Sequence, residues 1–225
     1  VGPIEVVTEY RHRTRASDVR GFEVNALERL PVRGPALIHC DSIEGQRSPG
    51  LEHYAARMRE PVTEENPVLM GLSFGGIMCT EIAKQIPVEK LIIISSIKTR
   101  DELPGWMKAV AMLRLNKFMP LRSSRMTEPL QNHFLGVTNE EDLKVARHYR
   151  QNADMKYVRW AVDQVVNWKN SLAHPSIYHI HGDNDKMFPI KKVKPDFTLK
   201  KGGHFMIMNR ASEVSDCINA ILQRP

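Results

Sequence analysis

The run Gly71-Leu72-Ser73-Phe74-Gly75-Gly76 restricts the possible folds of this chain more than any other feature. It follows the apolar residues 67–70 and opens a helical pattern over 77–84. Glycines on either side of Ser73 remove side chains that would clash where a sharp turn brings the backbone close to itself. Such a turn projects the hydroxyl into a cleft, with a helix N-terminus behind it. The pattern predicts strand, turn and helix, with Ser73 as a candidate nucleophile; a buried glycine turn without chemistry would look the same.

Short β-branched runs alternate with helical stretches along most of the chain, which is typical of βαβ units. Several expected strands are apolar on both faces, as strands covered by helices on both sides should be. The predicted fold class is therefore α/β, with a mainly parallel sheet and helices on both faces. The expected strands are Ile4–Thr8, Ala36–His39, Pro67–Gly71, Leu91–Ser95, Ser176–His181 and Asp196–Lys200, and the expected helices are Leu51–Arg59, Gly75–Gln85 and Ala211–Leu222.

The segment from residue 100 to residue 173 has a different pattern. Strand-like runs disappear, and the amphipathic stretches Lys108–Phe118, Glu140–Gln151 and Lys156–Trp168 dominate. We expect residues 1–99 and 174–225 to form the core domain and residues 100–173 to form a small helical cap inserted between two strands. The large apolar residues of this segment either form the core of a helical layer or line an apolar substrate cleft: Trp106, Met107, Met112, Met119, Trp160 and Trp168.

Composition and charge exclude several classes of protein. The 42% apolar and 26% charged residues are ordinary for a globular domain, and the longest apolar runs are far too short to cross a bilayer. The net charge of +6 permits nucleic-acid binding, but the basic residues are scattered. The densest cluster, 191–201, is interpreted as a solvated face, or more weakly as an attractor of an acidic substrate or carrier. Three scattered cysteines fit a reducing, cytoplasmic compartment.

A serine nucleophile needs a base within hydrogen-bond reach and an acid that orients the base. His204 is the candidate base, because it lies in a glycine-containing loop after a predicted strand and before the last helix. The acid should lie after the preceding strand, where the chain offers Asp183 and Asp185. All of these residues follow predicted strands, so a parallel sheet would bring them to one edge.

These motifs resemble the α/β-hydrolase fold superfamily, specifically its small serine esterase-like members. The resemblance runs from about Leu51 to the end and is carried by 71–76, by His181-Gly182-Asp183-Asn184-Asp185-Lys186 with Pro189, and by Gly202-Gly203-His204-Phe205. It implies the chain order Ser, Asp, His, and it selects Asp185, the third residue after the glycine, as the acid. Asp183 then becomes a loop-capping residue. The helical segment 100–173 corresponds to the family's variable cap.

One part of the family pattern is altered. Small relatives often carry Gly-x-Gly-x-Asp-x-Arg-x-Phe in the loop that helps to hold the oxyanion, whereas this chain has Thr14-Arg15-Ala16-Ser17-Asp18-Val19-Arg20-Gly21-Phe22. Both glycines are replaced, which strains or displaces the loop if those positions need a positive φ. The resemblance implies two oxyanion donors, the backbone N–H groups of Phe74 and Arg15.

We therefore expect a serine hydrolase with the triad Ser73, Asp185 and His204, which cleaves a carboxylic ester or thioester of a small to medium acyl substrate through an acyl-enzyme. The alternative is a ligand-binding protein of the same fold with little or no turnover, because of its impaired oxyanion loop. We expect no cofactor, because the nucleotide-binding glycine motifs are missing, and no metal, because no set of His, Cys, Asp and Glu has ligand spacing. The expected partner is a small-molecule substrate, with no nucleic acid and no membrane span.

Overall fold

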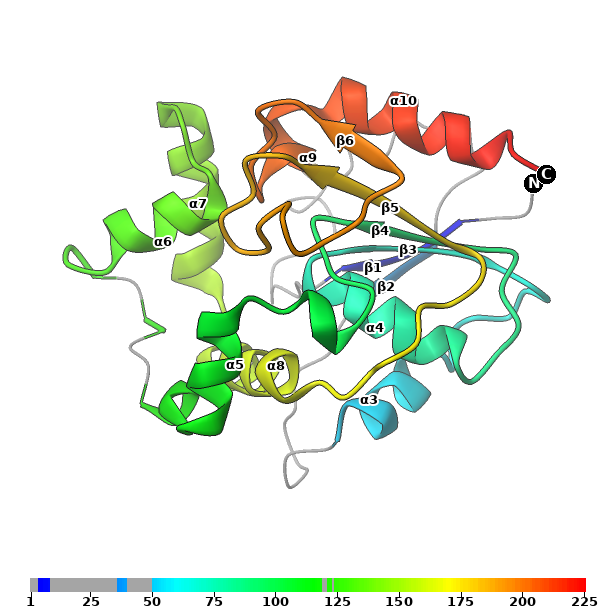
Figure 1. Cartoon of the computed structure of the whole chain (residues 1–225), viewed down its shortest axis with the longest axis horizontal. Coiled ribbons are helices and arrows are strands. Elements are labelled where there is room, and N and C mark those ends of the chain that lie inside the picture. The colour runs from blue at the N-terminus through cyan, green and yellow to red at the C-terminus, as the bar shows by residue number, and fades with distance from the viewer. Residues whose placement is uncertain (1–3, 9–35, 40–49, 119–120, 123) are drawn as a thin grey trace.

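The computed structural model describes residues 4–8, 36–39, 50–118, 121–122 and 124–225. Within these residues the chain forms a six-stranded sheet in the order β2-β1-β3-β4-β5-β6, and every neighbouring pair of strands is parallel (Figure 1). The predicted α/β class with a mainly parallel sheet is confirmed. The strands are β1 (Ile4–Thr8), β2 (Ala36–His39), β3 (Val68–Leu72), β4 (Lys90–Ile94), β5 (Ile177–Gly182) and β6 (Phe197–Leu199).

The register of β3, β4 and β5 places the carboxyl ends of these three strands side by side. Leu72 pairs with Ile94, and Ile94 pairs with Ile180. The side chains of β4 are buried along its whole length, and those of β3 are buried except at Leu72. Continuous apolar runs form these strands because helices cover both faces of a parallel sheet. The loops that follow β3, β4 and β5 therefore start at one edge of the sheet.

Helices cover the two faces of the sheet separately. On one face lie α3 (Leu51–Met58) and α4 (Phe74–Ala83), and on the other lies α10 (Ala211–Leu222) (Figure 1). The α4 helix is buried on all sides; most of its residues are apolar, and its buried polar residues Thr80 and Glu81 form hydrogen bonds with Gly76 and Trp168. The opposite core joins Ile218 and Ile221 of α10 to β4 and β5. A short helix, α9 (Met206–Asn209), precedes α10.

Between β4 and β5 the chain forms a series of helices, for which we keep the name cap (Figure 1). The predicted helix over Lys108–Phe118 is interrupted, because Arg114 adopts a left-handed conformation with φ of 54° and separates α5 from a 3-10 turn. The cap elements are the turn η1 (Arg100–Glu102), α5 (Gly105–Met112), the turn η2 (Leu115–Lys117), α6 (Glu128–Leu135), α7 (Glu140–Asn152) and α8 (Met155–Asn167).

Side chains of the cap connect it to the core. Trp160 of α8 lies against Tyr54 of α3 and Phe74 of α4, with ring centroids 4.5 and 5.7 Å apart. Met107, Trp160 and Trp168 are buried in this cluster, as the core interpretation of these residues requires. Trp106 and Met112 are exposed instead, and Met119 lies outside the described residues.

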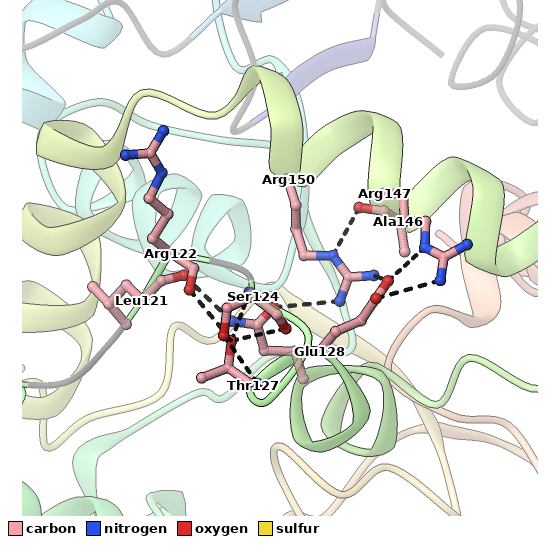
Figure 2. A network of polar contacts seen from close by, with 9 residues as sticks. Leu121, Arg122, Ser124, Thr127, Glu128, Ala146, Arg147 and Arg150 are labelled. Carbon is pink, nitrogen blue, oxygen red and sulfur yellow. Dashed lines mark hydrogen bonds and ion pairs between the residues drawn. The ribbon is translucent and has the colours of Figure 1, made fainter.

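Ion pairs hold two of the cap helices together. Figure 2 shows Arg147 and Arg150 of α7 reaching toward Glu128 at the start of α6. Arg147 Nε donates to Glu128 Oε1 at 2.6 Å, and Arg150 Nη2 lies 3.5 Å from the same oxygen. Arg147 is largely exposed, so this contact is mostly a surface interaction. No helix in the described part of the chain is long and apolar enough to cross a membrane.

Candidate active site

Ser73 occupies a tight turn between β3 and α4. Its φ of 51° and ψ of −116° lie outside the backbone conformations that residues other than glycine favour. Gly71 permits this turn, because a Cβ atom there would lie 2.3 Å from the carbonyl carbon of Gly75. Ser96, which follows β4, donates from Oγ to the carbonyl oxygen of Ser73 at 2.6 Å. The strand, turn and helix predicted around Ser73 are therefore present.

The structure brings three of the predicted site residues into one chain of contacts. Ser73 Oγ lies 3.0 Å from His204 Nε2, and His204 Nδ1 lies 2.9 Å from Asp185 Oδ2. Ser73 follows β3, Asp185 lies in the loop after β5, and His204 lies in the loop after β6. A carboxylate only accepts hydrogen bonds, so His204 donates from Nδ1 to Asp185 and turns the lone pair of Nε2 toward the Ser73 hydroxyl.

Asp185 is nearly inaccessible, and backbone groups hold its carboxylate. Its Oδ1 accepts hydrogen bonds from the N–H groups of Met187 and Phe188, at 2.8 and 2.9 Å. Burial alone would raise the pKa of Asp185, but the adjacent His204 ring, His181 and the hydrogen bond from Phe188 outweigh burial and lower it. The carboxyl group is therefore held in its charged form beside His204.

Asp183 lies elsewhere in the same loop. Its side chain is exposed, and its Oδ1 accepts a hydrogen bond from the backbone N–H of Lys201 at 2.5 Å. This contact ties the loop after β5 to the turn after β6, which is what a loop-capping residue does. Of the two acidic residues left open by the strand pattern, Asp185 alone contacts His204 in the described structure.

A close approach of two backbones sets the distance between the acid and the base. A Cβ atom on Gly182, the last residue of β5, would lie 2.1 Å from the carbonyl oxygen of Gly202. Asn184 N–H donates to that same oxygen at 3.0 Å. Glycines at both positions thus allow the loop of Asp185 and the loop of His204 to touch directly. This contact explains why a glycine precedes Asp185 and another precedes His204 in the sequence.

The sequence did not predict the pair His179 and His181, which lie two residues apart on β5. His181 Nε2 donates to the carbonyl oxygen of Phe188 at 2.7 Å and lies 3.6 Å from Asp185 Oδ2. His179 Nε2 lies 3.1 Å from His181 Nδ1. Burial lowers the pKa of both rings, that of His179 to about 2, so both are neutral at neutral pH. His181 thereby holds the turn whose N–H groups bind the Asp185 carboxylate.

Of the two expected oxyanion donors, only Phe74 lies among the described residues. Phe74 is the first residue of α4, where a backbone N–H has no acceptor within the helix. It adjoins Ser73, and the helix N-terminus adds a partial positive charge at the same point. Arg15, the second expected donor, and the rest of Thr14–Ser17 lie outside the described residues.

Together these contacts can activate a hydroxyl for attack on a carbonyl carbon. His204 can take the proton of Ser73, Asp185 can stabilise the imidazolium that forms, and Phe74 N–H can bind negative charge on the carbonyl oxygen. No group of three His, Cys, Asp or Glu side chains able to hold a metal ion occurs among the described residues.

Comparisons with known proteins agree with this architecture. A family model described as "Alpha/beta hydrolase family" matches residues 11–216. The chain is similar to a bromoperoxidase from Bacillus anthracis (TM-score 0.62, 14% identity, over 99% of this chain and 92% of that one). It is also similar to a lipase-esterase related protein from Clostridium acetobutylicum (TM-score 0.62, 16% identity, over 97% and 94%). A thermophilic esterase from Thermogutta terrifontis matches with a TM-score of 0.59 and 18% identity, over 98% and 89%.

At these identities the structural likenesses establish a shared fold. Comparison with curated proteins gives no match.

Proposed function

Because this chain belongs to the alpha/beta hydrolase family, as its motifs predicted, we propose that it is a serine hydrolase. Its substrate would be a carboxylic ester or thioester with a small to medium acyl group. The observation that carries the proposal is the unbroken chain of contacts from Ser73 Oγ through the His204 ring to Asp185, at 3.0 and 2.9 Å. A buried glycine turn without chemistry would need none of these partners.

In the first half of the proposed reaction, Ser73 Oγ attacks the carbonyl carbon while His204 Nε2 accepts the hydroxyl proton. The carbonyl π electrons move onto oxygen, where the N–H of Phe74 binds the developing charge. Asp185 stabilises the imidazolium through its bond to Nδ1. The tetrahedral intermediate then expels the alcohol or thiol, which takes its proton from His204 Nε2, and an acyl-serine remains.

In the second half, water takes the place of the leaving group. His204 Nε2 removes a proton from the water, the resulting oxyanion collapses, and Ser73 recovers its proton as the acid departs. Esters and thioesters suit this chemistry because their leaving groups are weaker bases than an amine and depart more readily from the tetrahedral intermediate.

The rival function is ligand binding with little turnover, and covalent labelling separates the two. A fluorophosphonate probe should label the wild-type chain on Ser73, and the chain should hydrolyse p-nitrophenyl acetate. In Ser73→Ala, labelling should disappear and hydrolysis should fall on the order of 10⁴-fold or more, because triad residues act as a unit. Unchanged circular dichroism would show that the variant is folded.

A folded wild-type chain that neither reacts with the probe nor cleaves the ester would identify a binding protein and contradict the proposal. Substantial hydrolysis by Ser73→Ala would show that another residue is the nucleophile. A series of p-nitrophenyl esters of increasing acyl length then locates the preferred substrate size.

A further inference from the structure

Large apolar side chains are exposed mainly in one region of the molecule. Seven of the eight such residues among those described lie between residues 106 and 130, and Leu172 is the exception. The side chain of Phe118 is 82% exposed, and that of Met112 is 77% exposed. Single exposed apolar residues are common on proteins, but a concentration of them marks an interaction site. The seven residues are Trp106, Met112, Leu113, Leu115, Phe118, Met126 and Leu130.

The charge of the same region has one sign. Residues 103–127 contain five basic residues and no acidic residue. Arg114 and Lys117 are exposed and stand in the sequence among Leu113, Leu115 and Phe118. Arg159 of α8 adds a further exposed cation beside this segment, since its Nη1 donates to the carbonyl oxygen of Lys117 at 2.9 Å.

These outward residues are not displaced parts of the core. The first turn of α5 already buries Met107 in the central cluster, together with the preceding Leu103. The end of α5 and the turn η2 then present their apolar side chains to solvent. We call the set of Met112, Leu113, Arg114, Leu115, Lys117 and Phe118 the cap surface.

We propose that the cap surface binds the face of a bilayer that contains anionic phospholipids. Long apolar side chains can enter the boundary between headgroups and acyl chains, while Arg and Lys between them contact the lipid phosphates. Both kinds of group meet in one plane at a bilayer face, and this matches the alternation of Leu113, Arg114, Leu115, Lys117 and Phe118. Such binding is peripheral and needs no membrane-spanning helix.

Charge argues against a second copy of this chain as the partner. A symmetric dimer through this face would place Arg114 and Lys117 opposite the same two cations, and residues 103–127 contain no acidic residue to compensate. Like charges that meet at an interface oppose association. An anionic bilayer instead supplies many negative charges and an apolar layer together.

Helix α5, whose C-terminal end carries part of the cap surface, is also connected to the candidate active site through α6. Trp106 of α5 contacts Phe134 of α6, with ring centroids 5.4 Å apart. One residue further, the carbonyl oxygen of Leu135 accepts a hydrogen bond from Phe205, next to His204, at 2.9 Å. Helix α5 therefore contacts α6, and α6 in turn contacts the loop that carries His204.

The membrane proposal does not rest on the proposed hydrolase activity, because vesicle binding is measured without substrate.

Vesicle sedimentation tests the proposal with the whole chain. The protein is mixed with vesicles of phosphatidylcholine alone, or of phosphatidylcholine with phosphatidylserine, at low and at high salt. We expect binding to the mixed vesicles to be at least about tenfold tighter than to the neutral ones, because each Lys or Arg near an anionic surface adds attraction. High salt should weaken it, because salt screens that attraction.

Two pairs of variants assign the binding to the cap surface. Arg114→Asn with Lys117→Gln should weaken binding about tenfold or more; asparagine suits the left-handed conformation of residue 114. The matched control, Lys191→Gln with Lys192→Gln, removes two exposed charges from another loop and should bind as wild type does. Leu113→Ser with Phe118→Ser should also weaken binding, whereas Leu172→Ser should not, because Leu172 is the one large exposed apolar residue outside this segment among the described residues.

A fluorescent reporter at the surface completes the test. The emission of Phe118→Trp should shift to the blue with anionic vesicles, whereas that of Leu172→Trp should not. The proposal would be overturned if the chain did not bind anionic vesicles at low salt, or if the Lys191 and Lys192 control lost as much binding as the cap-surface variant. It would also be overturned if the chain bound an acidic protein but not vesicles, or if it formed a dimer that Phe118→Ser abolishes and did not bind vesicles.

Ser73→Ala should bind vesicles as wild type does. The vesicle experiment therefore tests membrane binding even if the chain has no hydrolase activity.

Discussion

The two halves of the molecule that meet at His204 are held together in different ways. On the sheet side, backbone touches backbone: Gly182 lies against Gly202, and Gly71 lies against Gly75. In the cap, side chains make most of the contacts, through the ring of Trp160 and through ion pairs, and backbone meets backbone where the end of α6 touches the His204 loop. Direct backbone contact leaves no space for an added atom, whereas side-chain contacts can be repacked. The candidate site is therefore fixed by the core and by this junction, and the outer side chains of the cap constrain it less.

The largest expected effect lies on the sheet side, at the acid. Asp185→Asn should lower kcat on the order of 10⁴-fold, because an amide at this position favours the wrong tautomer of His204. Asp183→Asn should change kcat far less, because Asp183 contacts the backbone of Lys201 and not the His204 ring. Steady-state kinetics on p-nitrophenyl acetate would measure both. A large loss in Asp183→Asn alone would transfer the role of the acid to that residue.

The next effect concerns stability and tests the comparison between the halves directly. Gly182→Ala should lower the free energy of unfolding by about 3 kcal/mol or more, because the new methyl group would overlap the carbonyl oxygen of Gly202. In the cap, a Cβ atom on Gly105 would meet nothing within 4 Å. Gly105→Ala should therefore be neutral or stabilising by up to about 1 kcal/mol.

Urea unfolding measures both glycine variants under the same conditions. Equal losses in the two variants would show that backbone contact does not distinguish the halves. A stable Gly182→Ala variant would show that the loops of Asp185 and His204 can move apart.

A smaller effect follows from the buried histidine pair. The pKa of His179 falls from 6.5 to about 2 on folding, so between these values the unfolded chain binds the proton that the folded chain excludes. Stability should therefore decrease as the pH falls below about 6.5, by up to about 1.4 kcal/mol per pH unit for this one residue. The lowered pKa values of His181 and Asp185 act in the same direction, the latter only at more acidic pH.

Unfolding free energies between about pH 7 and about pH 5 would reveal this dependence, since those values bracket the ordinary pKa of histidine. His179→Gln should flatten it, because the amide keeps a donor for His181 but does not titrate. His148→Gln, at an exposed residue of the cap, should keep the wild-type slope. A wild-type slope in His179→Gln would show that the buried pair does not control acid stability.

The smallest effect is expected in the cap network of Figure 2. Glu128→Gln removes the charge that Arg147 and Arg150 share but leaves an oxygen acceptor in place. Arg147 is half exposed, whereas Glu128 and Arg150 are mostly shielded from solvent, so we expect the thermal midpoint to fall only slightly, by about 2–4 °C. A large drop would mean that the contact between α6 and α7 holds the cap in place. The cap would then tolerate changes at its contacts as poorly as the core does.

The sequence allowed the strands of the sheet to be predicted closely. Buried parallel strands are continuous apolar runs, and the expected Pro67–Gly71 and Leu91–Ser95 differ from β3 and β4 by one residue at each end. Ser73 and His204 were selected because each follows a predicted strand in a glycine-containing turn, whereas Asp185 was chosen over Asp183 by the family resemblance. The structure places them in contact, while their catalytic roles remain predictions.

Other features could not be predicted, for physical reasons. A helical pattern over Lys108–Phe118 does not show that Arg114 will adopt a left-handed conformation and end α5 early. The alternation of His179 and His181 shows that both face one side of β5, but their bond to each other and to Phe188 depends on how a distant loop folds back. Local patterns report local structure, whereas contacts of this kind depend on tertiary packing.

One feature of the cap restricts how this protein can be redesigned. Gly136, with φ of 72°, ends α6 so close to the His204 loop that a Cβ atom there would lie 3.0 Å from the Cα of Gly203. Anyone who grafts a cap from another hydrolase onto this core must therefore reproduce a glycine and a left-handed helix end at this junction. Among the described residues, the exposed outer side chains of the cap make no such backbone contact, so a graft has most freedom there.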